Sequence, residues 1–383
     1  MQAYRAALSQ NAPKFLAKPR SFHSSAHRAA TQSAIPHISL HIAASSSGKG
    51  RKFLNQNTLE FDPSEKVEQG VQKGRSIAER KRGRPDSGQD AFFIAKVGEE
   101  DEQLAFGIAD GVGGWTSSGV DPADFAHGLC SYMAVSALRA EHVDTPRNLL
   151  QKGYNDVHQD RSIPAGGSTA CIAIASTKGF VQIANLGDSG FLHLRRGAVH
   201  DLSSPQLHSF NTPYQLSVIP QHLIVQSAIF GGAPLSDQPS HADQFKQQLQ
   251  HGDVLVLASD GVWDNLNAQD VLDIVCREMQ KYGAWTETIS EGIVVSEEAA
   301  TLVKPGSVGG KHIASRTLQG VLAGAIAGEA KIASMNNKRD GPFAKEVQRY
   351  FPNENWHGGK VDDISVLVLI SIQEQNPGDT ELD

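Results

Sequence analysis

Three aspartates stand at the edges of long apolar runs, and this pattern constrains the fold more than any other feature of the sequence. Leu104 to Ala109 leads into Asp110, Val254 to Ala258 leads through Ser259 into Asp260, and Asp362 precedes Ile364 to Ile370. A single Asp-Gly pair is typical of a turn. Three carboxylates at the edges of buried strands are costly, however, unless they are paired or bind a metal ion.

The pattern therefore predicts one divalent-metal site that Asp110, Asp260 and Asp362 form together. A ligand set made only of oxygen atoms favours Mg²⁺, Mn²⁺ or Ca²⁺ over zinc. The chain has three cysteines, which is an odd number, and none has the CxxC spacing of a zinc knuckle. We therefore expect free thiols rather than a disulfide framework.

Composition narrows the class of protein further. The chain has 383 residues, enough for one large domain or two ordinary ones. Its 36 glycines and many short apolar runs favour a β-rich fold, and its net charge of -7 argues against sequence-independent binding of nucleic acid. No segment approaches the roughly 20 apolar residues that a membrane span needs. The sequence does not indicate an oligomeric state.

The first segment has the composition of a targeting signal. Residues 1–59 contain no Asp or Glu, and Arg and Lys are spread among Ala, Ser and His. This is typical of a mitochondrial transit peptide, and Arg20 to Ser25 resembles a site for the matrix processing protease. We expect import into the mitochondrion, to the matrix. The alternative is a disordered basic tail.

The remaining chain reads as alternating strands and helices. Strands are expected at 91–95 and 104–109, followed by an antiparallel pair of helices that begin at Asp121-Pro122 and Thr145-Pro146. The runs 170–175, 180–185 and 190–194 predict an antiparallel meander, and Asn267 predicts another helix start. Together these elements indicate an α+β fold, with helices covering the outer faces of an antiparallel β-sandwich.

The expected domain organisation is simple. Residues 1–59 form the transit peptide and a disordered lead, residues 60–373 form one folded domain, and residues 374–383 form a disordered tail. Gly283 to Lys311 shows little periodicity, so we expect a mobile insertion at about 283–320.

Short motifs occur along the chain in an order that is specific as a set. They are Gly88-Gln89-Asp90, Asp110 to Trp115, Gly167 to Ala170, Asn185 to Ser189, Ala258 to Asp264 and Asp362 to Val366. This order resembles the metal-dependent protein phosphatase family, protein phosphatase 2C, over about Asp86 to Ile372. Gly119 to Pro122 and Phe210 to Leu216 resemble in particular its short mitochondrial branch, whose animal member is called T-cell activation protein phosphatase 2C.

The resemblance implies a fold and a metal centre. The fold is a central sandwich of two antiparallel sheets, flanked by pairs of antiparallel helices in four αββα layers, with a two-metal site at one edge. Asp110 would bridge two Mg²⁺ or Mn²⁺ ions, the Gly111 carbonyl would ligate one of them, and Asp260 and Asp362 would hold the other. Asp90 would act through metal-bound water.

The resemblance also implies an activity. It is the hydrolysis of phosphoserine and phosphothreonine in phosphoproteins by water that two ions activate. Asp188 and Asp264 match positions that hold a third, weaker ion in relatives. Two alternatives stay open: a pseudophosphatase that binds a partner without turnover, and a phosphatase of small phosphorylated metabolites.

The sequence departs from the family pattern at three positions. Val112 stands where relatives commonly have the histidine that protonates the leaving alkoxide, so we expect aryl phosphates to be better substrates than alkyl phosphates. Gln89 replaces the usual glutamate. Pro85 occupies the position of the phosphate-binding arginine, and we expect the neighbouring Arg84 to bind phosphate in its place.

Overall fold

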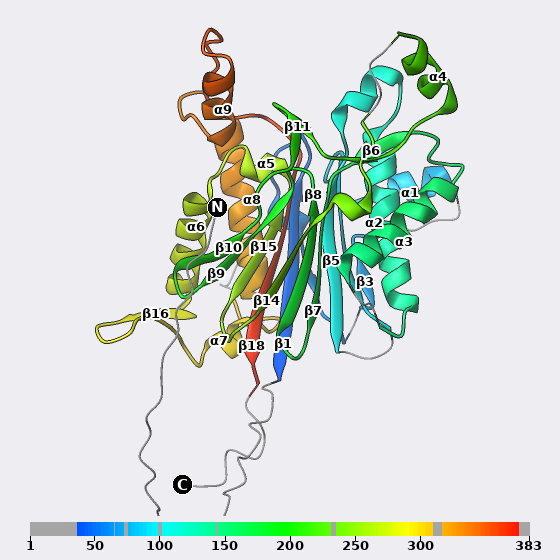
Figure 1. Ribbon diagram of the computed structural model, residues 1–383. Helices are drawn as coiled ribbons and strands as arrows, with labels where there is room; N and C mark the ends of the chain where they lie inside the picture. The colour runs from blue at the N-terminus through cyan, green and yellow to red at the C-terminus, as the bar shows by residue number, and fades with distance from the viewer. Residues whose placement is uncertain are drawn as a thin grey trace, which may run out of the picture. The chain divides into compact units, whose positions relative to one another are not determined.

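The apolar runs of the sequence form two antiparallel sheets that stack face to face (Figure 1). The computed structural model describes residues 37–64, 66–72, 76–98, 102–142, 145–230, 235–308 and 316–374. Residues 1–36 lie outside these ranges, and the expected processing site falls among them. All the described residues belong to one compact unit of the chain.

The first sheet has six strands among the described residues. Their order across the sheet is β10 (Ala198–Leu202), β9 (Gly190–Arg195), β15 (Val254–Ala258), β18 (Ile364–Gln373), β1 (Ile38–Ser47) and β2 (Thr58–Phe61). The centre of this sheet is β18, which pairs along its length with β1 on one side and with β15 on the other.

The second sheet also has six strands in the described part of the chain. Their order is β14 (Asp243–Gln248), β8 (Phe180–Leu186), β7 (Ala170–Ser176), β5 (Gln103–Asp110), β4 (Asp90–Lys96) and β3 (Glu68–Gln69). Every strand pair in this sheet is antiparallel.

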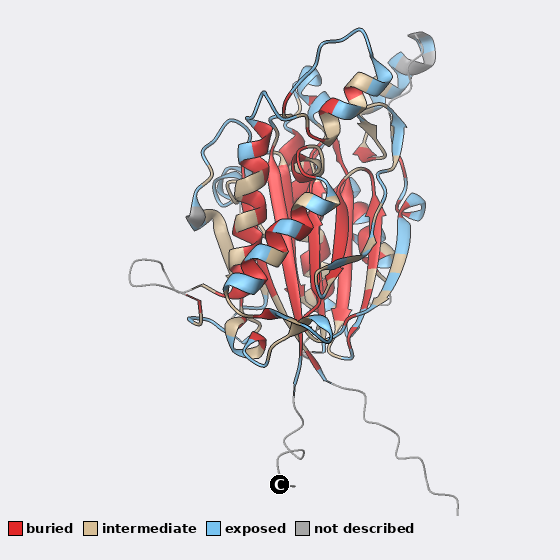
Figure 2. Ribbon diagram, turned by 90° about the vertical axis from the view of Figure 1, so that its left-hand side faces the viewer, coloured by how far each residue is buried: buried red, intermediate tan, exposed pale blue. Residues whose placement is uncertain are grey.

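Helices cover the outer face of each sheet (Figure 1), and in Figure 2 the helices of one side lie in front of the buried strands. The described residues therefore form three apolar layers. One lies between the sheets, where Phe106 and Phe191 meet Leu367. The second lies under α2 (Pro122–Arg139) and α3 (Pro146–Gln159), and the third under α6 (Ala268–Lys281) and α8 (Leu318–Ser334). The predicted α+β fold, an antiparallel sandwich in four αββα layers, is confirmed.

The predicted helix starts are also confirmed, because each uses the side chain that the sequence offers. The Asp121 carboxylate accepts from the Ala123 N–H, the Thr145 hydroxyl accepts from the Asn148 N–H, and the Asn267 side chain accepts from two N–H groups at the start of α6. Pro122 and Pro146 occupy the first turn, where a missing N–H costs nothing.

Shorter elements connect these layers. The short strand pairs are β11 (Leu207–Ser209) with β12 (Thr212–Pro213), β16 (Trp285–Thr288) with β17 (Gly292–Val295), and β6 (Gly166–Ser168) with β13 (Leu216–Val218). The further helices are α1 (Ile77–Arg82), α4 (Gln221–Phe230), α5 (Asp260–Trp263), α7 (Ala299–Leu302) and α9 (Pro342–Tyr350). The 3₁₀ turns are η1 (Asn55–Asn57), η2 (Gly113–Ser118) and η3 (Pro239–His241). Of the helices in the described ranges, none combines the length and the apolar character that crossing a membrane requires.

The predicted three-strand meander is wrong at its third strand. Strands β7 and β8 pair, but β9 leaves the second sheet and pairs with β15 and β10 in the first. Gly187, at φ +101°, allows the chain to turn between the sheets, because this left-handed region strains residues with a Cβ atom. As a result, the segment that carries Asp188 crosses from one sheet to the other.

The predicted domain start at residue 60 is too late. Strand β1 lies within the segment that composition assigned to the transit peptide, and all ten of its residues pair with β18. Ile42, Ala43 and Ala44 are fully buried. The composition of this stretch, which lacks Asp and Glu, gave no indication of a strand, although β1 is part of the sheet.

The predicted mobile insertion at about 283–320 is wrong for the described part of that segment. Trp285 is fully buried, and its indole N–H donates to the Gly252 carbonyl at 3.2 Å. Ala284, Ala299 and Val303 pack into the same apolar layer under α6 and α8. Weak periodicity therefore did not mean weak packing here.

Candidate metal centre

Carboxylates from both sheets meet at one edge of the sandwich. Asp90 begins β4 and Asp110 ends β5, and the two residues lie directly opposite each other in the strand register. Asp260 starts α5 just beyond the end of β15, and Asp362 lies two residues before β18. Asp188 comes from the connection between β8 and β9. The four buried strands therefore deliver the acidic side chains that the sequence singled out.

Asp110, Asp188 and Asp260 form the densest group. Each offers one carboxylate oxygen, and these three oxygen atoms lie within 4.8 Å of one another. They line a hollow of about 280 Å³ together with Gly111, Val112 and Asp362. Three acidic oxygen atoms this close repel one another unless a cation lies among them.

A lysine that the sequence analysis missed supplies one cation. The Lys360 ammonium lies 2.7 Å from Asp260, 2.5 Å from Asp264 and 3.3 Å from an oxygen of Asp362. Its side chain is only 15% exposed. Its position two residues before Asp362 in the last motif was the signal available in the sequence.

The two lysines of the site face different carboxylate oxygens of Asp362. Lys360 faces one, and the Lys49 ammonium lies 3.2 Å from the other. Lys49 follows β1, more than 300 residues before Asp362, and the sequence offers no signal for this contact. The register of β1 with β18 is what brings the two residues together.

Asp90 and Asp363 occupy a buried corner beside the hollow. The Ser259 hydroxyl donates to one Asp90 oxygen at 2.6 Å, and the other oxygen has no hydrogen-bond partner among the described residues. Asp363 accepts from the backbone N–H groups of Lys49 and Gln89. A buried acidic oxygen without a partner is the kind of atom that a cation or an ordered water satisfies.

The electrostatics of the site also favours a cation among these carboxylates. Burial, followed by repulsion from Asp260, raises the pKa of Asp110 well above its usual range and that of Asp188 to about 7. Burial and the Asp260 charge also raise the pKa of Asp264. Burial opposes ionisation of Asp260 too, but the nearby Lys360 charge outweighs it and lowers the Asp260 pKa. The site thus carries more negative charge than its own cations neutralise.

At two glycines of the motifs, the atoms of Asp363 leave no room for a Cβ atom. A Cβ atom on Gly261 would lie 1.9 Å from the Asp363 carbonyl oxygen, and one on Gly88 would lie 1.9 Å from its carboxylate. Gly88 also has φ +70°, a conformation that residues with a Cβ atom rarely adopt. The glycines therefore let the Asp90 and Asp260 segments close around Asp363.

The structure does not bring Arg84, the predicted phosphate-binding residue, to the hollow that holds Asp110. Its guanidinium lies 2.5 Å from Asp124 and 3.4 Å from Asp121, and its side chain is 12% exposed. It lines a small cavity beside Gln72 and not the hollow that holds Asp110. The start of α2 provides the two carboxylates that hold Arg84 away from the centre.

Val112 and Gln89 do line the hollow, as their motifs predict. The Val112 N–H donates to the Gly167 carbonyl at 3.0 Å, so the backbone here is fixed by β6. No histidine is among the described residues that line the hollow, so nothing there supplies the imidazole that Val112 lacks.

Comparisons with known proteins identify the family of the chain. The family model of protein phosphatase 2C matches residues 79–289. The 5-azacytidine resistance protein azr1 of Schizosaccharomyces pombe is 31% identical over 288 residues, which cover 75% of this chain and 82% of that protein. Protein phosphatase PTC7 homolog of Xenopus laevis is 33% identical over 285 residues, or 74% of this chain and 81% of that protein.

Two further relatives extend the match. Protein phosphatase 2C homolog 7, mitochondrial, of Saccharomyces cerevisiae is 27% identical over 358 residues, 91% of each chain. The solved structure of the photosystem II phosphatase PBCP superposes with a TM-score of 0.56 at 23% identity, covering 88% of this chain and 99% of that one, which is a likeness of fold. The chain therefore belongs to the protein phosphatase 2C family, in the branch of the PTC7 homologues, and is a protein serine/threonine phosphatase that depends on divalent metal ions.

Proposed function

We propose that this phosphatase works with two Mg²⁺ or Mn²⁺ ions held by Asp110, the Gly111 carbonyl, Asp260 and Asp362, with Asp90 in support. The observation that carries the proposal is that Asp110 and Asp260, together with Asp188, each offer a carboxylate oxygen within 4.8 Å of the other two. When bound, such ions supply a lowered pKa for water and a counter-charge for the phosphoryl group. All the ligands are oxygen atoms, which suits Mg²⁺ and Mn²⁺.

The buried acidic atoms support the fit of these ions. One oxygen each of Asp90 and Asp188 has no hydrogen-bond partner within the described ranges. Asp188 and Asp264 would hold a third, weaker ion, but the Lys360 ammonium already contacts Asp260 and Asp264 there. We therefore expect the third ion to compete with the Lys360 side chain.

In place of Arg84, we propose Lys49 as the residue that binds the phosphate group. Its ammonium lines the hollow at the edge of Asp362, and its side chain is 59% exposed. An exposed lysine can contact a phosphoryl oxygen as a point charge without first breaking a buried ion pair.

The lack of a histidine beside Val112 supports the expectation that aryl phosphates react faster than alkyl phosphates.

The proposed location is the mitochondrion, with the matrix as the compartment. Two observations support it: the Saccharomyces cerevisiae relative is named as mitochondrial, and residues 1–59 have the composition of a transit peptide. Because β1 belongs to the fold, the import signal must end before Ile38. The proposed phosphatase domain accordingly extends from β1 to β18, with phosphoproteins as substrates.

The experiment that tests the metal centre compares the full chain with Asp110→Asn. With Mn²⁺ or Mg²⁺ and a panel of phosphoserine and phosphothreonine peptides, we expect the substitution to lower kcat/KM roughly a hundredfold or more. Asp273→Asn, on the exposed side of α6, is the matched control and should keep activity. Titration calorimetry should count two ions for the wild type. Activity that survives a chelator, or the Asp110 substitution, would rule out the two-ion centre.

A further inference from the structure

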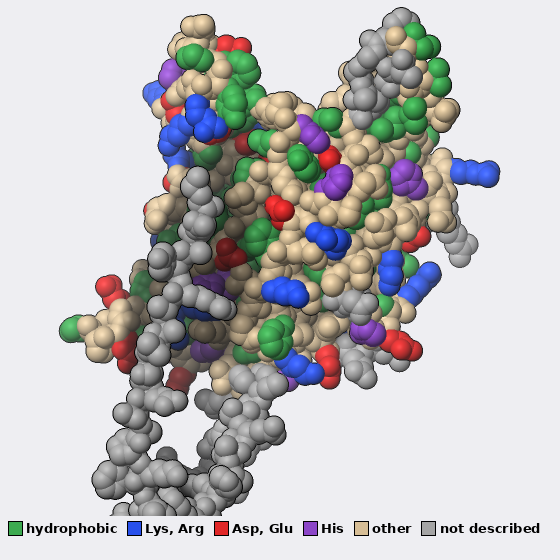
Figure 3. All heavy atoms as spheres, in the orientation of Figure 1, with side chains coloured by type: hydrophobic (Ala, Val, Ile, Leu, Met, Phe, Trp, Pro, Cys, Tyr) green, Lys and Arg blue, Asp and Glu red, His purple; other side chains and the backbone are tan. Residues whose placement is uncertain are grey.

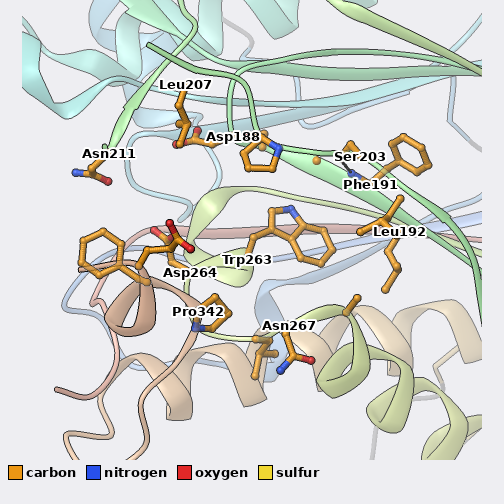
Figure 4. A pocket seen from close by; sticks show the side chains of 18 of the residues that line it. Asp188, Phe191, Leu192, Ser203, Leu207, Asn211, Trp263, Asp264, Asn267 and Pro342 are labelled. Carbon is orange, nitrogen blue, oxygen red and sulfur yellow. Dashed lines mark hydrogen bonds between the residues drawn. The ribbon is translucent and has the colours of Figure 1, made fainter. Parts of the chain in front are cut away.

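An apolar pocket of about 350 Å³ lies directly beside the metal centre (Figure 4). Strand β9, the β11–β12 hairpin, α5, the start of α6 and α9 surround it. Asp188 and Asn211 line both this pocket and the hollow that holds Asp110. Asp264 lines the pocket and binds Lys360, which lines the hollow. The pocket and the metal centre are therefore separated by a wall one side chain thick.

The pocket is polar at one end and apolar at the other. In Figure 4, Asn211, Asp188 and Asp264 lie at one end, Phe191 and Leu192 at the other, and the indole of Trp263 between them. The Lys360 ammonium, which lines the neighbouring hollow, binds Asp264 at the polar end and lies 5.0 Å from the centre of the Phe343 ring.

The polar groups of the apolar end are engaged within the protein. The Trp263 indole N–H donates to the Ala258 carbonyl at 2.8 Å, and the Ser203 hydroxyl accepts from the Phe191 N–H at 2.9 Å. The Asn267 side chain caps α6. What this end presents to a ligand is therefore mainly ring and aliphatic surface.

An aromatic cluster builds the outer wall. Phe210, on the turn of the β11–β12 hairpin, contacts Phe343, Tyr350 and Phe351, with ring centres 5.2 to 5.6 Å apart. These contacts join the hairpin to α9, although Phe210 and Phe343 are more than 130 residues apart in sequence. At the rim, Leu207 is 41% exposed and Tyr350 is 54% exposed. Apolar surface therefore continues from the pocket to the outside, and Figure 3 shows hydrophobic side chains over α9 on the face that it draws.

We propose that this pocket binds a bulky apolar side chain of the phosphoprotein substrate, from a residue near the phosphorylated serine or threonine. The proposal rests on the proposed function, because the phosphoryl group must lie at the metal centre. An extended peptide advances about 3.3 Å per residue, so a wall one side chain thick places the anchor within about two to four positions. The polar end meets the peptide backbone, and the apolar end takes the side chain.

The pocket has room for this occupant. Its volume corresponds to roughly a dozen waters at about 30 Å³ each. Waters beside ring and aliphatic surface have few hydrogen-bond partners, and their displacement by an apolar group is favourable. A leucine or phenylalanine side chain gains this energy, whereas a charged side chain would lose its own hydration.

The test is a set of phosphothreonine peptides in which leucine or phenylalanine replaces alanine at each position from four before to four after the phosphothreonine. With the full chain and Mn²⁺, we expect kcat/KM to rise about tenfold at one position. In Leu207→Asp, which charges the rim, and in Ala268→Trp, which fills the pocket, the ratio between that peptide and its alanine counterpart should fall toward one. Ile289→Asp, on the exposed β16–β17 turn, is the matched control and should keep the ratio.

The outcomes separate this proposal from the function on which it rests. If the wild type with Mn²⁺ hydrolyses no peptide, the proposed function itself fails. If it hydrolyses every peptide equally well, or if the preference persists unchanged in both pocket variants, the phosphatase stands but the pocket has another occupant and the proposal is overturned.

Discussion

Lys360 balances the charge of the metal centre before any ion is bound. Its ammonium contacts Asp260, Asp264 and Asp362, and these carboxylates raise its own pKa despite burial. An internal cation at this place keeps the acidic strand ends together in the metal-free protein. The same cation has to give way, or share its carboxylates, when an ion binds. We therefore propose that Lys360 supports the fold and competes with the metal ion.

Replacing Lys360 by methionine keeps most of the side-chain bulk and removes the charge. We expect the metal-free variant to lose about 3 kcal/mol of unfolding free energy, because a partly buried ion pair loses one partner. Mn²⁺ should then raise its melting temperature more than that of the wild type, since the ion replaces the missing charge. Differential scanning fluorimetry with and without Mn²⁺ measures both effects.

Lys49→Met is the matched control for this prediction. Lys49 contacts only one oxygen of Asp362 with its ammonium, and that side chain is more exposed. Exposed ion pairs contribute little to stability, so we expect Lys49→Met to lose less than about 1 kcal/mol of unfolding free energy. Equal loss of stability in the two variants, or an unchanged response of Lys360→Met to Mn²⁺, would contradict the role given to Lys360.

At the scale of the element, the sequence predicted those strands whose apolar runs end in a motif. Val254 to Ala258 and Ile364 to Ile370 were recognisable because a buried strand on both faces gives a continuous apolar run. Strand β9 was recognisable too, but the sheet to which it belongs was not. Strands of either sheet have the same local pattern, and the crossing depends on a turn at Gly187 whose direction the sequence does not specify.

Strand β1 was missed for a different reason. Its sequence ends in Ala-Ala-Ser-Ser-Ser, which in isolation is typical of a linker, and its burial comes from β18, more than 300 residues away. Trp285 shows the same effect, since its partners lie in layers that only the tertiary fold assembles. Arg84 was misplaced because its proximity to Asp90 in sequence says nothing of the carboxylates on α2. Long-range contacts decided all three cases.

The place of β1 gives a prediction about truncation. Deleting residues 1–36 should abolish import into mitochondria of yeast cells but leave the melting temperature of the purified protein unchanged. Deleting residues 1–61 should prevent folding, because β18 loses its ten-residue partner and the sandwich loses Ile42 and Phe61. Cell fractionation with protease protection reports the location, and circular dichroism with thermal melting reports the fold.

The shorter deletion is the control for the longer one. A protein that lacks residues 1–61 and still melts at the wild-type temperature would show that β1 is dispensable. A protein that lacks residues 1–36 and still reaches the protease-protected fraction would remove the support that composition gives to a transit peptide.

At the scale of the whole molecule, the metal centre is where the two sheets are joined. Asp90 and Asp110 come from the second sheet, Asp260 and Asp362 from the first, and Asp188 from the segment that crosses between them. An ion held by these residues, as we propose, would link both layers of the sandwich. Metal binding should therefore stabilise the fold as a unit, and stability has to be compared at fixed metal concentration.

The pH dependence of that stability has an identifiable contribution from one buried histidine. His127 on α2 is 1% exposed, and its two ring nitrogens have no hydrogen-bond partner in the described part of the chain. Burial first, and the nearby Arg84 charge second, lower its pKa to about 3. The unfolded chain has an ordinary histidine pKa of about 6.5. Between these two values the unfolded state binds a proton that the folded state excludes.

Stability should accordingly fall as the pH drops below about 6.5, by about 1.4 kcal/mol per pH unit for this group, and show no contribution from it at higher pH. Between pH 7.5 and pH 5.0 the metal-free wild type should lose about 2 kcal/mol more than His127→Leu, which has nothing to protonate. Urea unfolding at both pH values measures the difference, with exposed His222→Gln as the control that behaves like the wild type. Parallel losses in the wild type and His127→Leu would mean that the imidazole takes up its proton in the folded state, for which α2 would have to open.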